Sequence, residues 1–249
     1  MAGRHKISGQ MQKLEELKIA ANALGLETDN GAAAAFIDFY HLVISYNEKV
    51  NLTSITDPLE FEIKHFVDSI AAAPYLSESA KIIDVGSGAG FPAVPLKILR
   101  PDLEVLMLDC LKKRVDFLDL VIKSLKLKNV AAVHARAEDA AKGALRESFD
   151  AALARAVGGL PTIMEYSAPY VKSGGKFIAY KTSADELIGS EAAAKELGLA
   201  FSAAPAYTLP DGSARTLFIF EKTAPTPKKY PRAGNKPKTQ PIGKAAYTK

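Results

Sequence analysis

The sequence KIIDVGSGAG, residues 81–90, determines the expected fold. It begins with an apolar strand candidate, Lys81–Val85, and runs into a glycine-rich loop, after which an apolar helical pattern extends to about Leu99. A glycine loop between a strand and a helix is where many α/β proteins bind nucleotides. The dinucleotide motif Gly-x-Gly-x-x-Gly would need a third glycine at the position of Phe91, and the Gly-Lys-Ser/Thr of a P-loop is absent. Neither of these phosphate-binding motifs is therefore predicted.

Asp84 stands two residues before the loop glycines, which are Gly86, Gly88 and Gly90. A carboxylate at the strand end would repel a pyrophosphate, so we expect a ligand with a cationic or hydroxylated group there. S-adenosylmethionine meets this requirement, since it has no phosphate and carries an ammonium and a sulfonium. The glycines would let the backbone approach the ligand where a Cβ would clash. The alternative is a glycine turn that only packs a helix against a strand.

Two further positions fit a nucleotide-like ligand. Asp109 ends the second expected strand, 25 residues after Asp84, where a carboxylate accepts hydrogen bonds from ribose hydroxyls. Ala137 and Glu138 follow the third strand, where backbone amides and a carboxylate could contact an adenine. The alternatives are a turn residue or helix cap for Asp109 and a first-turn helix acid for Glu138.

From residue 80 onward, short apolar strands alternate with helices. This alternation predicts βαβ units and a mostly parallel sheet covered on both faces. Residues 201–209 and 215–221, joined by the turn Pro210–Ser213, predict an antiparallel hairpin at the end. The expected strands are 81–85, 103–108, 130–133, 149–154 and 176–180, with helices near 138–146, 160–171 and 184–197. The predicted fold class is α/β: a Rossmann-like, mostly parallel sheet with a C-terminal antiparallel hairpin.

Three helical patterns fill the first 76 residues and predict a small helical domain over residues 1–79. The third begins at Asp57-Pro58-Leu59-Glu60, which supplies an N-cap carboxylate, a proline at the first helical position and a glutamate at the third. The Rossmann-like domain would then cover residues 80–222, and a basic tail residues 223–249.

The charges are unevenly distributed along the chain. Residues 222–249 hold seven lysines and Arg232 but no Asp or Glu, whereas the whole chain carries a net charge of +4. The part before them is therefore acidic. A basic tail on an acidic body is typical of a protein that binds a polyanion. One other interpretation is a solvated tail without a partner. Another is a tail that folds back through Tyr230, Pro231 and Ile242 and covers a sheet edge or a domain seam.

The composition excludes several classes of protein. With 48% apolar and 24% charged residues, the chain is neither disordered nor collagen-like. It has no apolar stretch of bilayer length and no secretory signal at its start. Cys110 is the single cysteine, and no Cys/His cluster has zinc spacing. We expect a cytoplasmic monomer that binds neither a metal nor a membrane.

Several motifs together resemble one family. The stretch DVGSGAGFP, residues 84–92, looks like the cofactor loop of class I methyltransferases, and its extension to Leu96 is more particular. With four further motifs, it resembles the bacterial 16S rRNA guanine-N7 methyltransferase family, also called glucose-inhibited division protein B. These motifs are Asn51–Thr53, Lys64–Ser69, Arg155-Ala156 and Lys229–Gly234. The sequence departs from the family pattern at Ala93, where a glycine is expected, and at Thr239-Gln240, which interrupt the basic tail.

The resemblance implies the class I S-adenosylmethionine-dependent methyltransferase fold. It further implies methyl transfer to N7 of one guanine in the 530 loop of 16S rRNA, free or in the 30S subunit, with S-adenosylhomocysteine as the product. The family's cofactor contacts fall on Gly86, Phe91, Ala137, Glu138 and Arg155.

Guanine N7 has an exposed lone pair and no proton to lose, so this reaction needs neither a general base nor a covalent nucleophile. Catalysis would come from aligning N7, the methyl carbon and sulfur in one line. Arg155, after the fourth strand, is expected to face the transferring methyl group and to bind the cofactor carboxylate, guanine O6 or a phosphate. The alternative is a salt bridge at the sheet edge. His65 is expected to lie at the domain interface or to face RNA.

Four cationic residues are candidate RNA contacts. Lys229 and Arg232 belong to the tail, Lys181 ends the fifth strand, and Arg136 precedes the expected adenine site. Two other functions remain open: a methyltransferase for a small molecule or a protein, and an RNA-binding module that has lost its cofactor.

Overall fold

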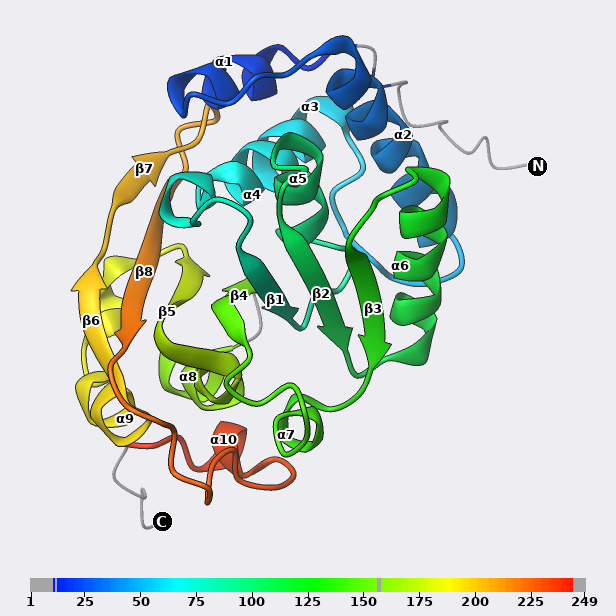
Figure 1. Ribbon diagram of the computed structural model, residues 1–249. Helices are drawn as coiled ribbons and strands as arrows, with labels where there is room; N and C mark the ends of the chain where they lie inside the picture. Colours follow the sequence, from blue (N-terminus) through cyan, green and yellow to red (C-terminus); the bar gives the residue numbers. More distant parts are fainter. Residues whose placement is uncertain (1–10, 12, 156–157, 244–249) are drawn as a thin grey trace, which may run out of the picture.

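The computed structural model describes residues 11, 13–155 and 158–243. Its centre is an eight-stranded sheet with the strand order β3-β2-β1-β4-β5-β8-β6, and β7 also pairs with β8 (Figure 1). The first five strands are parallel, whereas β8 runs antiparallel to β5 and to β6 and β7. The strands are β1 Lys81–Val85, β2 Glu104–Asp109, β3 Val130–His134, β4 Phe149–Arg155, β5 Val171–Lys181, β6 Leu199–Ala203, β7 Ala206–Thr208 and β8 Ala214–Lys222. The predicted parallel sheet with a terminal hairpin is confirmed.

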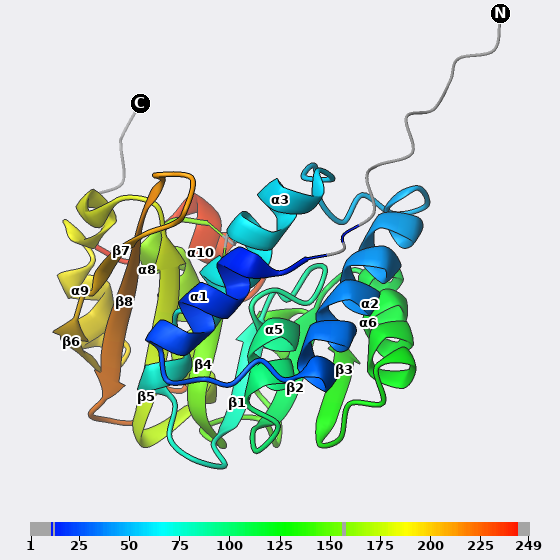
Figure 2. The ribbon, with the colours of Figure 1, turned by 90° about the horizontal axis from the view of Figure 1, so that it is seen from above.

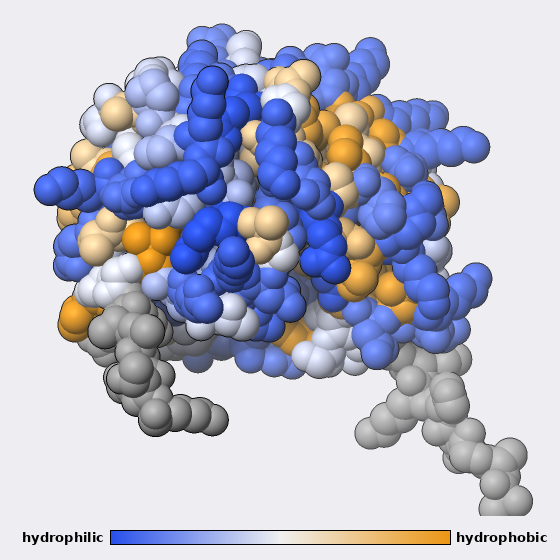
Figure 3. All heavy atoms as spheres, turned by 90° about the horizontal axis from the view of Figure 1, so that it is seen from below, coloured by the Kyte–Doolittle hydropathy of each residue, from blue (hydrophilic) through white to orange (hydrophobic). Residues whose placement is uncertain are grey.

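Helices cover both faces of the sheet (Figures 1 and 2). One layer holds α1 Glu15–Ala23, α2 Asn30–Asn47, α3 Pro58–Phe61, η1 Glu62–Val67, α4 Asp68–Ile70, η2 Ala73–Tyr75, α5 Ala93–Leu99 and α6 Lys112–Ser124. The other holds α7 Ala137–Ala140, α8 Leu160–Ser167, η3 Ala168–Tyr170, η4 Ala184–Leu187, α9 Glu191–Glu196 and α10 Lys236–Thr239. The outer surface of this second layer is mostly hydrophilic, with smaller hydrophobic patches (Figure 3).

Alternate residues of the strands enter two separate cores, as the period of a pleated strand requires. Ile82 packs with the helices of the first layer, and the next residue, Ile83, packs with those of the second. Phe36 and Phe66, from the first 76 residues, belong to the same core as Ile82. The helices predicted as an N-terminal domain therefore share a core with the sheet, and the division at residue 79 stays a prediction.

The third N-terminal helix begins where the sequence predicts. Asp57 accepts a hydrogen bond of 3.0 Å from the Glu60 N–H, and Pro58 is the first helical residue. The helix then changes to a π-helix at Glu62–Val67 before it returns to α geometry. Short π segments inside α-helices frequently occur at functional sites.

Two predicted helices were too long. The one expected near 138–146 ends at Ala140, and the one expected over 184–197 is split into η4 and α9. Gly189 lies between η4 and α9 and has a φ of +77°, which a continuing right-handed helix cannot include. Within the described residues, no helix is both long and apolar enough to span a membrane.

Candidate active site

The three loop glycines have different roles, although all have a positive φ, of 81°, 58° and 94° for Gly86, Gly88 and Gly90. Gly86 lines a cleft at the carboxyl end of β1. The Gly88 N–H donates a hydrogen bond of 2.9 Å to Asp109 Oδ2. A Cβ on Gly90 would lie 2.7 Å from the Val94 side chain. A side chain at Gly90 would therefore clash with other protein atoms, which agrees with the alternative that the turn packs a helix against a strand. Of the three loop glycines, only Gly86 borders the cleft.

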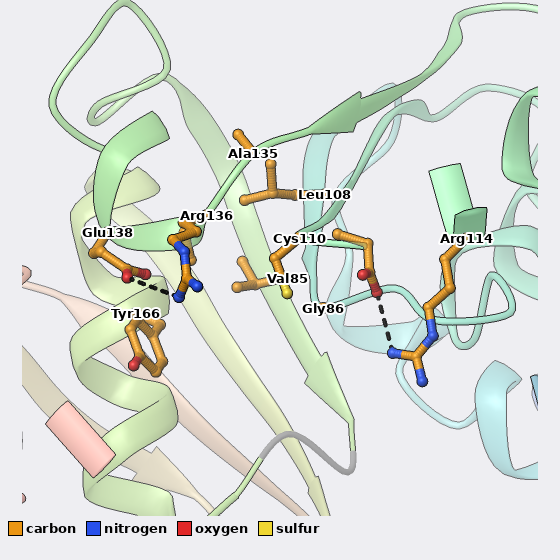
Figure 4. A pocket seen from close by; sticks show the side chains of 11 residues that line it. Val85, Gly86, Leu108, Cys110, Arg114, Ala135, Arg136, Glu138 and Tyr166 are labelled. Carbon is orange, nitrogen blue, oxygen red and sulfur yellow. Dashed lines mark ion pairs between the residues drawn. The ribbon is translucent and has the colours of Figure 1, made fainter. Parts of the chain in front are cut away.

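The first cleft has a volume of about 250 Å³ and lies over the carboxyl ends of β1, β2 and β3. Arg136, Glu138 and Tyr166 lie on one side of it and Arg114 on the other (Figure 4). Its remaining lining residues are Val85, Gly86, Leu108, Asp109, Cys110, Ala135 and Ala137. Of the predicted cofactor contacts, the fold thus brings Gly86, Asp109, Ala137 and Glu138 together.

The Asp109 carboxylate organises the backbone around this cleft. It is almost fully buried, accepts the Gly88 N–H through Oδ2 and the Leu111 N–H at 2.8 Å through Oδ1, and lies 3.5 Å from the Arg114 guanidinium. These contacts connect the glycine loop to the start of α6. Binding of a ribose by the same carboxylate stays a prediction.

The opposite wall is formed by Ala137, Glu138 and Tyr166. The Tyr170 hydroxyl donates a 2.6 Å hydrogen bond to the Ala137 carbonyl, which fixes the turn after β3. Glu138 is buried, and its carboxylate lies 3.7 Å from Arg136, whose side chain is largely exposed. Tyr166 was not predicted, because its place in the cleft depends on how α8 packs.

Asp84 lies beneath the glycine loop and is fully buried. Neither of its carboxylate oxygens accepts a hydrogen bond of normal geometry from the described residues. Burial raises the pKa of this carboxyl to about 7, although Ser87 and Arg155 favour the ionised form. Burial makes the ionised acid costly, so additional positive charge nearby would stabilise its charged form.

A second cleft, of about 320 Å³, lies at the carboxyl ends of β4 and β5. Arg155 lies in its wall, where the guanidinium donates to the Asp68 carboxylate at 2.9 Å and to the Lys64 carbonyl at 3.2 Å. This is the salt bridge that the sequence left as an alternative for Arg155. The remaining lining residues are Ile55, Lys64, His65, Asp68, Tyr180, Lys181, Thr182, Glu186 and Arg215.

His65 connects Arg155 to the glycine loop. Its Nδ1 lies 3.3 Å from the Arg155 guanidinium, which can only donate, so Nδ1 is the acceptor and Nε2 carries the proton. Nε2 lies 2.8 Å from the Thr53 hydroxyl. Burial, Arg155 and Lys64 lower the pKa of His65 to about 3, so the ring stays neutral.

The Phe91 ring packs away from the first cleft. It stacks on His65 with a centroid distance of 4.4 Å and an interplanar angle of 8°, and the Arg155 guanidinium lies 5.1 Å from its centroid. Phe91 thus links the glycine loop to the second cleft. Contact between Phe91 and a cofactor stays a prediction.

The predicted RNA contacts lie in three places. Arg136 borders the first cleft and Lys181 the second, whereas Lys229 and Arg232 lie outside both. The Arg232 guanidinium binds the fully buried Glu165 carboxylate, at 2.6 Å between Nη2 and Oε2. Arg232 therefore fastens the tail to α8.

Lys222, the last residue before the tail, is also packed against the body. Lys222 is buried, and its ammonium donates to the Ala168 carbonyl at 2.8 Å. Burial lowers its pKa to about 8. Lys229 is 65% exposed and pairs with Glu196 at 2.6 Å. Lys244 and Lys249 of the tail lie outside the described residues, as does Ala156 of the Arg155-Ala156 motif.

Sequence reasoning missed the residues that surround Arg155. The Asp68 carboxylate also accepts a 2.8 Å hydrogen bond from the Tyr207 hydroxyl and lies 3.5 Å from the Arg215 guanidinium. Asp68 belongs to the Lys64–Ser69 motif, which was the available signal. Tyr207 and Arg215 come from opposite arms of the hairpin, and no local pattern marks them.

Comparisons with known proteins indicate the same family over most of the chain. The sequence model of the GidB family, described as rRNA small subunit methyltransferase G, matches residues 32–210. Proteins named ribosomal RNA small subunit methyltransferase G are similar to this chain in Leuconostoc mesenteroides and Desulfitobacterium hafniense. Both are 42% identical to this chain. The match with the Leuconostoc protein covers 92% of this chain and 98% of that protein, and the match with the Desulfitobacterium protein covers 90% of this chain and 95% of that protein.

A solved structure shows the same fold. One chain of the complex between the Haloferax volcanii Trm112 methyltransferase activator and a methyltransferase matches with a TM-score of 0.53. The match has 13% sequence identity and covers 75% of this chain and 98% of that chain. The architecture is that of class I S-adenosylmethionine-dependent methyltransferases.

Proposed function

This chain belongs to the rRNA small subunit methyltransferase G family, and we propose that it methylates N7 of one guanine in the 530 loop of 16S rRNA. It is an S-adenosylmethionine-dependent methyltransferase of small-subunit rRNA. The choice of N7 rests on the family resemblance of the sequence motifs and on the chemistry of the two clefts. The proposed enzyme is a cytoplasmic monomer, and S-adenosylhomocysteine is its second product.

The first cleft fits S-adenosylmethionine, which supplies an electrophilic methyl group when bound. Gly86, Asp109, Ala137 and Glu138 would hold it, since they combine exposed backbone with two carboxylates. The buried Asp84, whose oxygens have no normal hydrogen-bond partner among the described residues, favours a ligand with positive charge. This charge pattern disfavours a dinucleotide with its pyrophosphate.

The residues near the second cleft suit an acceptor that has no proton to lose. His65 contacts Arg155, both its ring nitrogens have partners, and its pKa is about 3. It is therefore unsuited to accept a proton. The chain's contribution is to hold the acceptor base in line for direct transfer, without a covalent enzyme intermediate.

One observation carries the proposal: the two clefts lie side by side along the carboxyl edge of the sheet, over β1–β3 and over β4–β5. Phe91, His65 and Arg155 are in contact and join the glycine loop of the first cleft to the wall of the second. A cofactor in one and a nucleobase in the other would meet near this connection. Ligands of open α/β sheets bind at this edge, where the strand order reverses.

The test measures transfer of a labelled methyl group to free 16S rRNA, to 30S subunits, and to a mixture of metabolites and proteins. We expect labelled RNA whose chain breaks at one guanine after the borohydride and aniline treatment that cleaves at N7-methylguanine. Label at another guanine atom would contradict the N7 assignment. Label only in metabolites or proteins would contradict the RNA substrate.

A further inference from the structure

The second cleft contains more positive than negative groups, but its two carboxylates differ in availability. Asp68 already binds Arg155, Tyr207 and Arg215. Its side chain is only 7% exposed, so it has little capacity left for a ligand. Glu186 is different, because 34% of its side chain is exposed while it also lines the cleft.

Glu186 forms a pair with Lys181 at the end of β5. Lys181 Nζ lies 2.7 Å from Glu186 Oε2 and donates a 2.5 Å hydrogen bond to the Gly158 carbonyl. The ammonium has three N–H donors, and these two contacts with described residues use two of them. A carboxylate can accept about four hydrogen bonds, so the pair with Lys181 uses only part of its capacity. The cleft thus presents a fixed donor beside a fixed acceptor.

We propose that Lys181 and Glu186 read the Watson–Crick edge of the target guanine, an inference that rests on the function proposed above. Guanine presents the O6 acceptor beside the N1–H and N2–H donors on this edge. Lys181 Nζ would donate to O6, and the Glu186 carboxylate would accept from N1–H and N2–H. N7 lies on the other edge of the base and stays free for methylation.

The same pair rejects adenine. Adenine has the N6 amino donor where guanine has O6, and N1 is an acceptor. The ammonium would then face a donor and the carboxylate an acceptor, so neither group could form a hydrogen bond with the base. Enzymes that modify a base usually take it out of the stack and read its Watson–Crick edge in the pocket. A loop of single-stranded RNA makes this edge accessible.

A phosphate of the RNA backbone is the competing occupant, since Lys64, Arg155 and Arg215 also line the cleft. The two occupants predict opposite effects for Glu186. A carboxylate repels a phosphate, so its removal would leave phosphate binding unchanged or improve it. The same removal would weaken guanine binding.

The experiment compares two acceptors, 16S rRNA with guanine or with inosine at the target position, assembled into 30S subunits and also as free RNA. Inosine keeps O6 and N1–H but lacks the N2 amino group. The enzymes are the full-length wild type, Glu186→Gln, Lys181→Met and Glu104→Gln. Glu104 pairs with Lys81 at 3.1 Å near the start of β1, so its variant loses the same kind of charge far from the cleft.

We expect wild type and Glu104→Gln to prefer guanine to inosine by about 10-fold or more in kcat/KM, the scale of one hydrogen bond to a charged group. Glu186→Gln should lower kcat/KM for guanine by about 10- to 100-fold and bring the guanine-to-inosine ratio close to one. Lys181→Met should lower the rate on both acceptors. Calorimetry should give wild-type affinity of both cleft variants for S-adenosylmethionine.

Three results would overturn the inference. A Glu186→Gln variant as active as wild type, together with an impaired Lys181→Met variant, would assign the cleft to a phosphate. An equal loss on guanine and inosine in Glu186→Gln would assign the carboxylate a purely structural role. A wild-type enzyme that methylates neither RNA would overturn the proposed function itself, which distinguishes that failure from the first two.

Discussion

The two clefts at the carboxyl edge of the sheet are built in different ways. The first is held by backbone groups and by residues close to the glycine loop, such as Asp109, which binds the Gly88 and Leu111 N–H groups. The second is held by an ion pair and a hydrogen bond between distant parts of the chain: Asp68 pairs with Arg155, 87 positions away, and accepts from the Tyr207 hydroxyl, 139 positions away. A substitution in the first cleft should therefore change cofactor affinity, and a substitution in the second should change stability.

The largest effect is expected from Asp68→Asn, which removes the negative charge shared by Arg155 and Arg215. Breaking a buried ion pair from one side leaves an uncompensated charge, so unfolding free energy should fall by about 3–5 kcal/mol. Cofactor affinity of the folded fraction should stay within about 3-fold of wild type, because the first cleft does not use Asp68.

Denaturant unfolding and calorimetry measure the two quantities. Glu104→Gln serves as control and should cost less than about 1 kcal/mol, because its ion pair with Lys81 is exposed. A large loss of cofactor affinity in Asp68→Asn would show that the clefts are not separable.

Gly86→Val should lower the affinity for the cofactor, the property that Asp68→Asn should leave almost unchanged. Gly86 borders the first cleft with a φ of +81°, so a branched side chain there would occupy ligand space and strain the loop. We expect S-adenosylmethionine affinity to fall by about 100-fold or more, equivalent to about 2.7 kcal/mol. Gly174→Val is the matched control, since Gly174 has the same φ, and its Cβ would have nothing within 4 Å. Equal affinity losses in both variants would assign the effect to strain alone.

A buried group beside each cleft should change the slope of stability against pH, and the two slopes should have opposite signs. The folded-state pKa of His65, beside the second cleft, is about 3 against an ordinary 6.5. Between these values the unfolded state binds the extra proton, so His65 makes stability rise with pH. The folded-state pKa of Asp84, beneath the first cleft, is about 7 against an ordinary 3.8, so Asp84 makes stability fall with rising pH.

Between about pH 4 and 6.5 the two contributions oppose each other. Relative to wild type, His65→Gln should lower the slope of unfolding free energy against pH, and Asp84→Asn should raise it, each by at most about 1.4 kcal/mol per pH unit. Denaturant titrations over this range, without cofactor, measure the slopes. Slopes that change in the same direction in both variants would contradict the assignment.

The smallest effect concerns Lys229, which lies outside both clefts. Its ion pair with Glu196 is largely exposed, so Lys229→Met should leave the stability of the protein almost unchanged. If Lys229 binds a phosphate, the slope of log affinity for rRNA against log salt should become shallower by about 1. Filter binding at several salt concentrations checks this. An unchanged slope would remove Lys229 from the RNA interface.

The sequence alone was sufficient to predict the sheet, the hairpin and the proximity of Gly86, Asp109 and Glu138 at one edge of the sheet. Strand β1 and the glycine loop are one continuous stretch, and Asp109 and Glu138 follow the next two strands. In a parallel sheet the carboxyl ends of neighbouring strands meet at one edge, so local order along the chain becomes proximity in space.

Only the tertiary structure decided what surrounds Arg155 and what the tail does. Lys64, Glu186 and Arg215 line the same cleft as Arg155 because a π-helix, a 3-10 turn and a hairpin converge there, and no local period encodes that convergence. The composition of the tail left RNA contact, a solvated tail and packing against the body open, and in the structure Arg232 binds the buried Glu165. A charge count cannot distinguish a solvated cation from a packed one, because burial depends on whether the fold provides a carboxylate or carbonyl partner at that position.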